Sequence, residues 1–318
     1  MKFKFNLKVI EKMKAYFSIS SIFVILALGV FFTKGLNYGI DFAGGNLIQV
    51  KFIEKSISLE EVNMNLDKIS EKLPQINVNS RKVQISDDGT IIIRFQEVNE
   101  VEKKEILDNL AELGKYNLEK DDKVGASIGS DLKKSAIYSL IIGSILIIAY
   151  VTLRFEFTFA IAGIITLLHD IIIAVGFIAL LQYEVDTPFI AAILTILGYS
   201  INDTIVIFDR IRENLRRMKN NNWTLEECMD ASVDQTLTRS INTSITTLFA
   251  IIAVLVFGGA SLKTFIVTML IGVVAGSYSS IFVATPLVYV LNKKKNRDMG
   301  EYFKEKEEQE ERVEKILV

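Results

Sequence analysis

The sequence predicts an α-helical polytopic membrane protein, with six transmembrane helices and one α+β ferredoxin-like extracytoplasmic domain. Half of the 318 residues are hydrophobic, and only 3 are proline. Six apolar runs are long enough, at about 20 residues each, to cross about 30 Å of hydrocarbon. The one long polar stretch between the first two runs alternates between strand and helix patterns. The six runs are residues 16–32, 136–153, 157–181, 188–208, 241–258 and 264–291.

Basic residues are distributed unequally around these runs. Lysines precede the first run, arginines and lysines separate the fourth from the fifth, and Lys293 to Arg297 follow the last. The short loops of the other side carry Glu184, Asp186 and a single Lys263. By the positive-inside rule, both termini are expected in the cytoplasm. The predicted division is a cytoplasmic N-terminus (1–15), transmembrane helix 1 (16–33), an extracytoplasmic domain (34–133), helices 2–6 (134–292) and a charged cytoplasmic tail (293–318).

Composition narrows the function classes. The net charge of −2 says little about function, because the charges are distributed unequally between the two sides of the membrane. The basic stretches indicate helix orientation and contact with anionic lipid, and no nucleic-acid binding. The first run resembles a cleavable signal, but its small residues lie inside an apolar run that continues to Phe32, which indicates a retained anchor. The single cysteine, Cys228, falls in a cytoplasmic loop, which excludes a disulfide framework outside.

The stretch 34–133 follows a βαββαβ pattern. Alternating apolar residues at 48–52 predict a strand, and Ser58 with Glu61 forms a capping box before a helix. Asp88-Gly89 predicts the turn of a hairpin, Asn99 opens a second helix, and residues 124–128 are expected to form the closing strand. This order is typical of a ferredoxin-like sandwich, a scaffold that fixes no function by itself.

Catalytic motifs fail in their context, so the chain is not expected to be an enzyme and no cofactor is predicted. Residues 125–129 match G-x-S-x-G, but the only histidine, His169, lies in a membrane run and cannot serve that serine. Residues 258–264 resemble a phosphate loop but have Leu262 where the second glycine is required. Because the chain has one cysteine and one histidine, no metal site built from these ligands is expected.

Ionisable residues inside the membrane runs indicate a transport function. Asp203 lies in the fourth run, and a carboxylate at the bilayer centre costs about 2.5–3.5 kcal/mol on insertion scales. Asn202 and Asp203 share one broad side of the fourth helix, and Arg239 and Thr243 form a polar stripe on the fifth. We therefore expect Arg239 to pair with Asp203 and the pair to couple an ion gradient. His169 and Asp170 add polar groups at mid-depth of the third helix.

Two alternatives accompany these polar residues. The same groups could form a static hydrogen-bond cluster between helices, as membrane proteins use. On the sixth helix, Gly272, Gly276 and Ser280 repeat at intervals of four, which predicts close approach of a neighbouring backbone. Packing alone, or sliding of the helices during a transport cycle, is compatible with that pattern.

Several segments together resemble the SecD/SecF family of protein-export membrane proteins, within the resistance-nodulation-division superfamily. The resemblance covers about residues 1–292. Two signature segments flank the extracytoplasmic domain: residues 39–45, with Gly39, Asp41, Phe42, Gly44 and Gly45, and residues 124–132, with Gly125 and Gly129. The second departs from the family pattern, with Ala126 in place of proline and Asp131 in place of glutamate. Matching segments inside the membrane are residues 198–204, 209–214, 238–244 and 276–281.

The resemblance implies an auxiliary subunit of the Sec translocase in the bacterial cytoplasmic membrane. It implies work with SecD beside the SecYEG translocon on an exported polypeptide, with YajC-like and YidC-like membrane subunits as further partners. In the family, the residues matching Asp203 and Arg239 are associated with proton passage that drives late steps of export. Two rival functions remain: an exporter of lipids or small molecules of the same superfamily, and a purely structural stabiliser of the translocon. The coupling ion, H⁺ or Na⁺, stays open because Asn202 and Asp203 offer oxygens suited to either.

Overall fold

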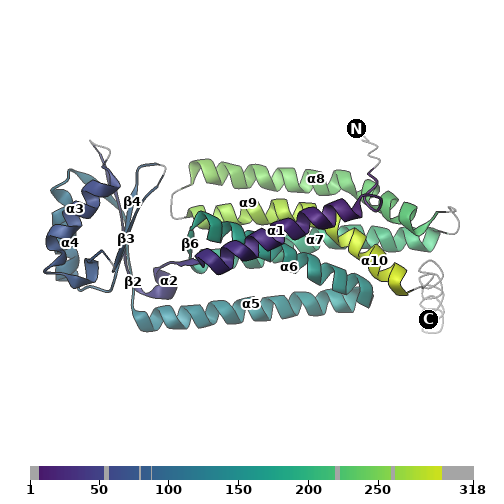
Figure 1. Cartoon of the computed structure of the whole chain (residues 1–318), viewed down its shortest axis with the longest axis horizontal. Helices are drawn as coiled ribbons and strands as arrows, with labels where there is room; N and C mark the ends of the chain where they lie inside the picture. Colours follow the sequence, from purple (N-terminus) through teal and green to yellow (C-terminus); the bar gives the residue numbers. More distant parts are fainter. Residues whose placement is uncertain are drawn as a thin grey trace, which may run out of the picture.

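The computed structural model describes residues 7–53, 57–78, 80–86, 88–218, 223–258 and 262–295. Within these described residues, six helices or helical runs are long and apolar enough to cross a membrane, and they confirm all six predicted runs. Figure 1 shows them as an elongated bundle with the strands gathered beyond one end. The predicted acidic tail lies outside the described residues from residue 296 onward, as do the first six residues of the chain. The bundle consists of α1 (Met13–Lys34), α5 (Ala126–Arg154), α6 (Phe157–Leu181), α7 (Thr187–Arg217), α8 (Leu225–Phe257) and α9 (Lys263–Ser279), with α9 continued by η3 (Ser280–Ala284) and α10 (Thr285–Lys295).

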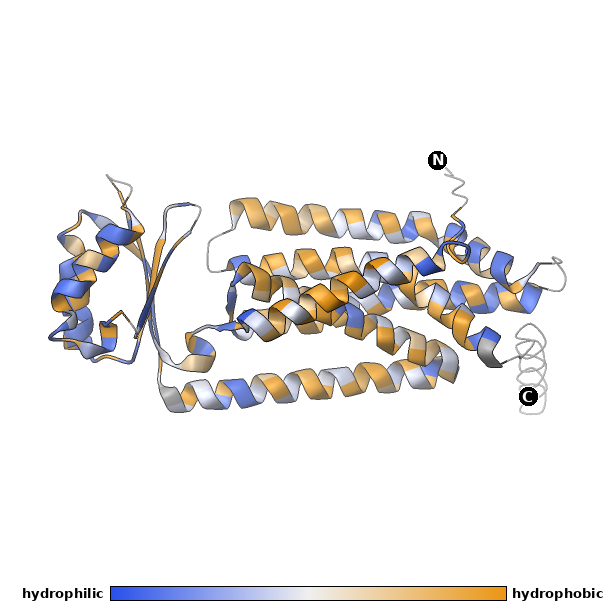
Figure 2. Cartoon of the chain, viewed as in Figure 1, coloured by the Kyte–Doolittle hydropathy of each residue, from blue (hydrophilic) through white to orange (hydrophobic). Residues whose placement is uncertain are grey.

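The outside of the bundle is apolar along α1, α5 and α8. Large hydrophobic side chains stand exposed there, including Phe32, Leu153 and Phe257. In Figure 2 the middle stretches of these helices are mostly orange, while blue gathers toward their ends. Exposed apolar surface of this extent suits contact with hydrocarbon rather than water.

The separate domain is a four-stranded antiparallel sheet with two helices on one face (Figure 1). The strand order β3-β4-β2-β5 places the first and third strands of the domain at the centre, which confirms the predicted ferredoxin-like βαββαβ fold. Both helices begin with capping boxes, Ser58 with Glu61 and Asn99 with Glu102. The elements are β2 (Gly45–Phe52), α3 (Leu59–Ser70), η1 (Pro74–Ile76), β3 (Arg81–Ile85), β4 (Ile91–Phe95), α4 (Glu100–Ala111) and β5 (Tyr116–Val124).

The closing strand was predicted at the wrong place. Residues 124–128 were expected to form it, whereas the strand is β5, and Gly125 is already the N-cap of α5. The sequence of β5, YNLEKDDKV, carries five charged residues and therefore has no apolar alternation to reveal it. Its backbone nevertheless pairs along the whole of β2. Residues 126–133, within the predicted extracytoplasmic stretch, form the first turns of α5.

The two signature segments meet where the domain joins the bundle. The chain passes from α1 through β1 (Asn37–Tyr38) and α2 (Ile40–Ala43) into β2. Gly44 and Gly45 have φ of 74° and 117°, and a Cβ on Gly45 would lie 2.5 Å from the carbonyl oxygen of Phe95. A Cβ on Gly129 would lie 3.1 Å from the amide nitrogen of Gly44, so α5 packs directly on the α2 turn. Phe42 packs against the hydrophobic cluster of the bundle that contains Val185 and Phe189.

Small residues on α9 allow α7 to approach closely. A Cβ on Gly272 would lie 2.2 Å from Ile196, and one on Gly276 would lie 3.0 Å from Ser200. After Ser279 the helix widens into the π-helical segment η3, which is followed by Pro286. Proline lacks the backbone N–H that would continue the α-helical hydrogen bonding, which accounts for the irregular turn.

Candidate functional site

Asp203 is buried in the bundle, with one carboxylate oxygen unpaired among the described residues. It lies near the middle of α7, its exposed fraction is 4%, and its Oδ2 atom has no hydrogen bond among the described residues. Buried polar groups are almost always hydrogen-bonded, so an unpaired carboxylate oxygen requires an explanation. Retaining a carboxylate in this position costs stability, which makes Asp203 a candidate for function.

The expected ion pair between Asp203 and Arg239 is not formed in this structure. No ion pair joins the two side chains within 4.0 Å in the part of the chain that the structure describes. The broad polar side of α7 divides: Asp203 points into the bundle, whereas Asn202 is exposed. Arg239 is also exposed, on α8. Two neighbouring residues on one broad side of a helix can therefore face different environments, one inside the bundle and one outside it. Helical spacing alone does not predict which residue faces which environment.

The exposed residues form a polar seam at membrane depth. Tyr199 holds α7 and α8 together: its hydroxyl donates to the carbonyl oxygen of Thr243 at 3.0 Å and lies 2.6 Å from the Thr247 hydroxyl. Beside this contact, polar side chains of both helices face outward from the bundle. Polar side chains in contact with hydrocarbon are unfavourable, so this seam suits contact with another protein surface. The polar seam consists of Thr195, Asn202, Arg239, Asn242 and Thr246.

Asp170 is the centre of a second polar cluster, inside the bundle. Its exposed fraction is 1%. Its Oδ2 atom accepts hydrogen bonds from the hydroxyls of Ser200 at 2.6 Å and Ser279 at 2.9 Å, and its Oδ1 atom lies 2.8 Å from Nδ1 of His169. The carboxylate therefore joins α6, α7 and α9. His169 lies beside the ring of Tyr278, with the ring centroids 6.5 Å apart.

The cluster continues along α7 and η3. The hydroxyls of Thr204 and Ser280 lie 2.9 Å apart, and Ser280 also donates to the carbonyl oxygen of Ser200. Ser200, Thr204 and Ser279 were not among the predicted site residues, because serine and threonine in apolar helices show no pattern beyond small size. We name this group the hydroxyl cluster: Asp170, Ser200, Thr204, Ser279 and Ser280. Asp203 belongs to the same helix as two of its members, Ser200 and Thr204.

Comparisons with known proteins assign the family. Residues 103–294 match the family described as "Protein export membrane protein SecD/SecF, C-terminal", and residues 29–52 match the SecD/SecF GG motif. "Protein translocase subunit SecF" of Sebaldella termitidis is 47% identical over 309 residues, which cover 97% of this chain and 99% of that protein. The protein of the same name from Helicobacter pylori strain J99 is 38% identical over 292 residues, covering 90% and 86% of the two chains.

Solved structures show the same architecture. The crystal structure of SecDF, a translocon-associated membrane protein from Thermus thermophilus, superposes with a TM-score of 0.82 at 33% identity and covers 92% of this chain. A second structure, SecDF in a super-membrane-facing form, gives a TM-score of 0.66 at 32% identity over 93% of this chain. The chain spans only 39% of the first and 40% of the second. With its matched domains, close relatives and common fold, this multi-pass membrane protein belongs to the SecD/SecF family of protein-export membrane proteins.

Proposed function

We propose that this chain is an ion-coupled subunit of a bacterial protein translocase, which works with a SecD-type partner to drive late steps of polypeptide export. The observation that carries the proposal is Asp203, a buried carboxylate at membrane depth without a local hydrogen-bond partner for Oδ2. A group in this state can take up and release a cation, which a static hydrogen-bond cluster does not require. A purely structural stabiliser of the translocon would have no use for it. We retain H⁺ and Na⁺ as candidate coupling ions.

The two carboxylates have different roles in this proposal. Both carboxylate oxygens of Asp170 are hydrogen-bonded, and the residue connects three helices. A change in its hydrogen bonds would therefore alter the packing of α7 and α9 together. Asp203 lies three residues beyond Ser200, one of the donors to Asp170. We propose that Asp203 takes up and releases the coupling ion, and that Arg239, Asn202 and Thr243 assist it. We further propose that Asp170, with His169, links this event to helix packing.

A SecD-type partner is supported by the polar seam. Arg239 and Asn202 are exposed within the membrane span, where a second protein surface is needed to satisfy them. The related Thermus chain, named SecDF, is more than twice the length of the part matched here. We propose that the partner covers the seam, that the assembly adjoins SecYEG and the exported polypeptide, and that YajC-like and YidC-like subunits and anionic lipid are further contacts.

Partner capture tests the proposed assembly. Gently solubilised protein is expected to co-purify with a SecD-type chain, because the seam is incomplete alone. Replacing Asn242 and Thr246 by leucine should weaken this capture, since the leucines cannot satisfy polar groups of the partner. Exposed residues of α5 that do not belong to the seam provide the control, and Ile141→Leu with Ile145→Leu should leave capture unchanged. Recovery of a lone monomer that supports full gradient-stimulated export would contradict the proposal.

The orientation of the chain is also a proposal. In Figure 1 the start of α1 and the end of α10 lie at the end of the bundle opposite the sheet domain. Together with the distribution of basic residues, this arrangement supports a cytoplasmic location for both termini and an extracytoplasmic one for the domain. A phosphatase reporter that is active only outside should be active after Asn99 and inactive after Met218, and a fluorescent reporter that folds only in the cytoplasm should show the reverse. The opposite pattern would overturn the orientation.

A further inference from the structure

The N-terminus of α7 is capped in part by a residue that is distant in the sequence. The first turn of a helix leaves backbone N–H groups without intrahelical partners. Asp186 accepts the N–H of Phe189 at 3.0 Å, and Pro188 has no N–H to satisfy. The remaining N–H, that of Thr187, is 2.9 Å from Oδ2 of Asp41, 146 residues away in the chain. The signature segment therefore completes the N-terminal cap of the helix that carries Asp203.

A short parallel strand pair reinforces this contact. Asn37 and Tyr38 of β1 pair with Glu184 and Val185 of β6 (Glu184–Val185), the strand directly before α7. The N–H of Gly39 donates to the carbonyl oxygen of Val185 at 2.9 Å. The side chain of Asn37 donates to the carbonyl oxygen of Gln182 at 2.8 Å. The linker from α1 to the sheet domain is thus fastened to the loop between α6 and α7.

The sheet domain itself reaches the same loop. Arg94 of β4 forms an ion pair with Glu184 of β6, and the two side chains are only 9% and 17% exposed. Burial lowers the pKa of Arg94 to about 10, while the charge of Asp186 opposes this change. Lys82 of β3 also donates to Oδ1 of Asn37 at 2.6 Å. Removing one member of a buried pair leaves an uncompensated charge, so the Arg94–Glu184 contact is sensitive to single substitutions.

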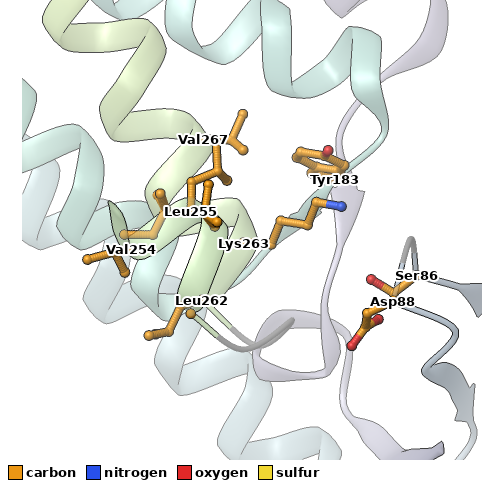
Figure 3. A pocket seen from close by; sticks show the side chains of 11 residues that line it. Ser86, Asp88, Tyr183, Val254, Leu255, Leu262, Lys263 and Val267 are labelled. Atoms are coloured by element: carbon orange, nitrogen blue, oxygen red, sulfur yellow. The ribbon is translucent and has the colours of Figure 1, made fainter. Parts of the chain in front are cut away.

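The sheet domain contacts the bundle at the start of α7, and a pocket lies on its side toward α8 and α9. Beside the outer ends of α8 and α9, the hairpin of β3 and β4 is separated from the bundle by a pocket of about 490 Å³. Figure 3 shows Ser86 and Asp88 of the hairpin on one side of this pocket, with Tyr183, Leu255 and Lys263 across from them. Among the described residues, the domain is therefore attached to the start of α7, and a pocket lies between its hairpin and the outer ends of α8 and α9.

We propose that Asp41 and the Arg94–Glu184 pair are positioning residues that make the sheet domain and α7 move as one body. This inference rests on the proposed ion coupling at Asp203, which lies 16 residues beyond Thr187, about 24 Å along the helix at 1.5 Å per residue. A displacement of α7 that follows ion exchange at Asp203 is then carried to the sheet domain through its capped end. The pocket beside the outer ends of α8 and α9 leaves space for the hairpin of β3 and β4 to follow.

The first test compares Asp41→Ala with Asp41→Asn in vesicles where this chain and its SecD-type partner replace the native pair. Asparagine keeps an oxygen that accepts the Thr187 N–H, whereas alanine does not. We expect Asp41→Ala to lose most gradient-stimulated export while ATP-driven export and assembly persist, and to speed hydrogen exchange in residues 187–190 about tenfold. Asp41→Asn should retain most of the stimulation. Asp108→Ala, an exposed position on α4, is the control.

Full stimulation in Asp41→Ala, or equal loss in Asp41→Ala and Asp41→Asn, would overturn the inference. Asp203→Asn in the same vesicles separates this result from failure of the proposed function. If Asp203→Asn keeps its stimulation, ion coupling itself is wrong. If Asp203→Asn loses stimulation while Asp41→Ala keeps it, only the link to the sheet domain is wrong.

The second test uses the ion pair and a covalent lock. Arg94→Glu and Glu184→Arg should each lose gradient-stimulated export, and the double exchange should restore much of it. The exposed pair Lys68 and Glu112, exchanged in the same way, should have no effect. A disulfide between Tyr38→Cys and Val185→Cys, which are Cα partners in the strand pair, should leave stimulation intact because the two strands move together. Loss of stimulation on oxidation, restored by reduction, would show that they move apart.

Discussion

Asp203→Asn is expected to abolish gradient-stimulated export while leaving expression, assembly and ATP-driven export intact. Asparagine keeps the size of the side chain and most of its hydrogen-bonding capacity but carries no exchangeable charge. One elementary charge crossing the membrane potential is worth about 2.3 kcal/mol per 100 mV, so a few ions per cycle are sufficient for a helix displacement. The measurement is export into inverted vesicles with and without an imposed gradient.

The matched control for Asp203→Asn is the same exchange at Asp108, an exposed residue of α4. Asp108→Asn makes the same chemical change outside the membrane helices and leaves the Asp203 carboxylate in place. It is expected to retain full gradient stimulation. Full gradient stimulation in correctly assembled Asp203→Asn would show that the carboxylate has only a structural role.

Asp170→Ala is expected to have the largest effect on stability. It leaves the hydroxyls of Ser200 and Ser279 and the ring of His169 without their shared acceptor in the bundle core. Each buried polar group left unsatisfied costs about 1–3 kcal/mol. We expect a marked loss of thermal stability, measured as retention of the monodisperse detergent-solubilised complex after heating, together with loss of export.

Asp170→Asn separates packing from coupling at this position. The asparagine side-chain oxygen still accepts a hydrogen bond, so most of the thermal stability should be retained. Because we place Asp170 in the coupling path, gradient-stimulated export should nevertheless fall. Full stimulation in Asp170→Asn would assign Asp170 to packing alone. Ser244 of α8, which contacts Ser277 of α9 at 2.6 Å outside the hydroxyl cluster, provides a control as Ser244→Ala.

The sequence predicts the membrane helices and the sandwich well because both depend on periodic burial. Runs such as 157–181 are predominantly apolar, and the capping boxes at Ser58 and Asn99 mark helix starts by local chemistry alone. The strand β5 escapes prediction because its position depends on backbone pairing with β2, and its side chains are mostly charged. The pattern of apolar residues therefore predicts elements whose side chains pack in a core. It does not reveal a strand such as β5, which is held mainly by backbone hydrogen bonds to β2.

The candidate site is only partly predictable for a similar reason. Asp203 and Asp170 are recognisable because a carboxylate in an apolar run is costly. The direction of each side chain depends on how the helices pack, so the ion pair of Asp203 with Arg239 was expected and is not formed. The partners of Asp170 come from α7 and α9, far away in the sequence. The cap that Asp41 places on α7 likewise joins segments 146 residues apart, and local sequence carries no sign of it.

Ion flux through the assembled pair tests the central claim most directly. The chain and its SecD-type partner are reconstituted in liposomes that contain a pH-sensitive and a sodium-sensitive dye, and a gradient of H⁺ or Na⁺ is imposed in turn. We predict that one of the two ions enters faster than in empty liposomes, and that Asp203→Asn reduces this flux to the level of empty liposomes while the complex stays assembled. Equal flux in the wild type and in Asp203→Asn, for both ions, would contradict the account.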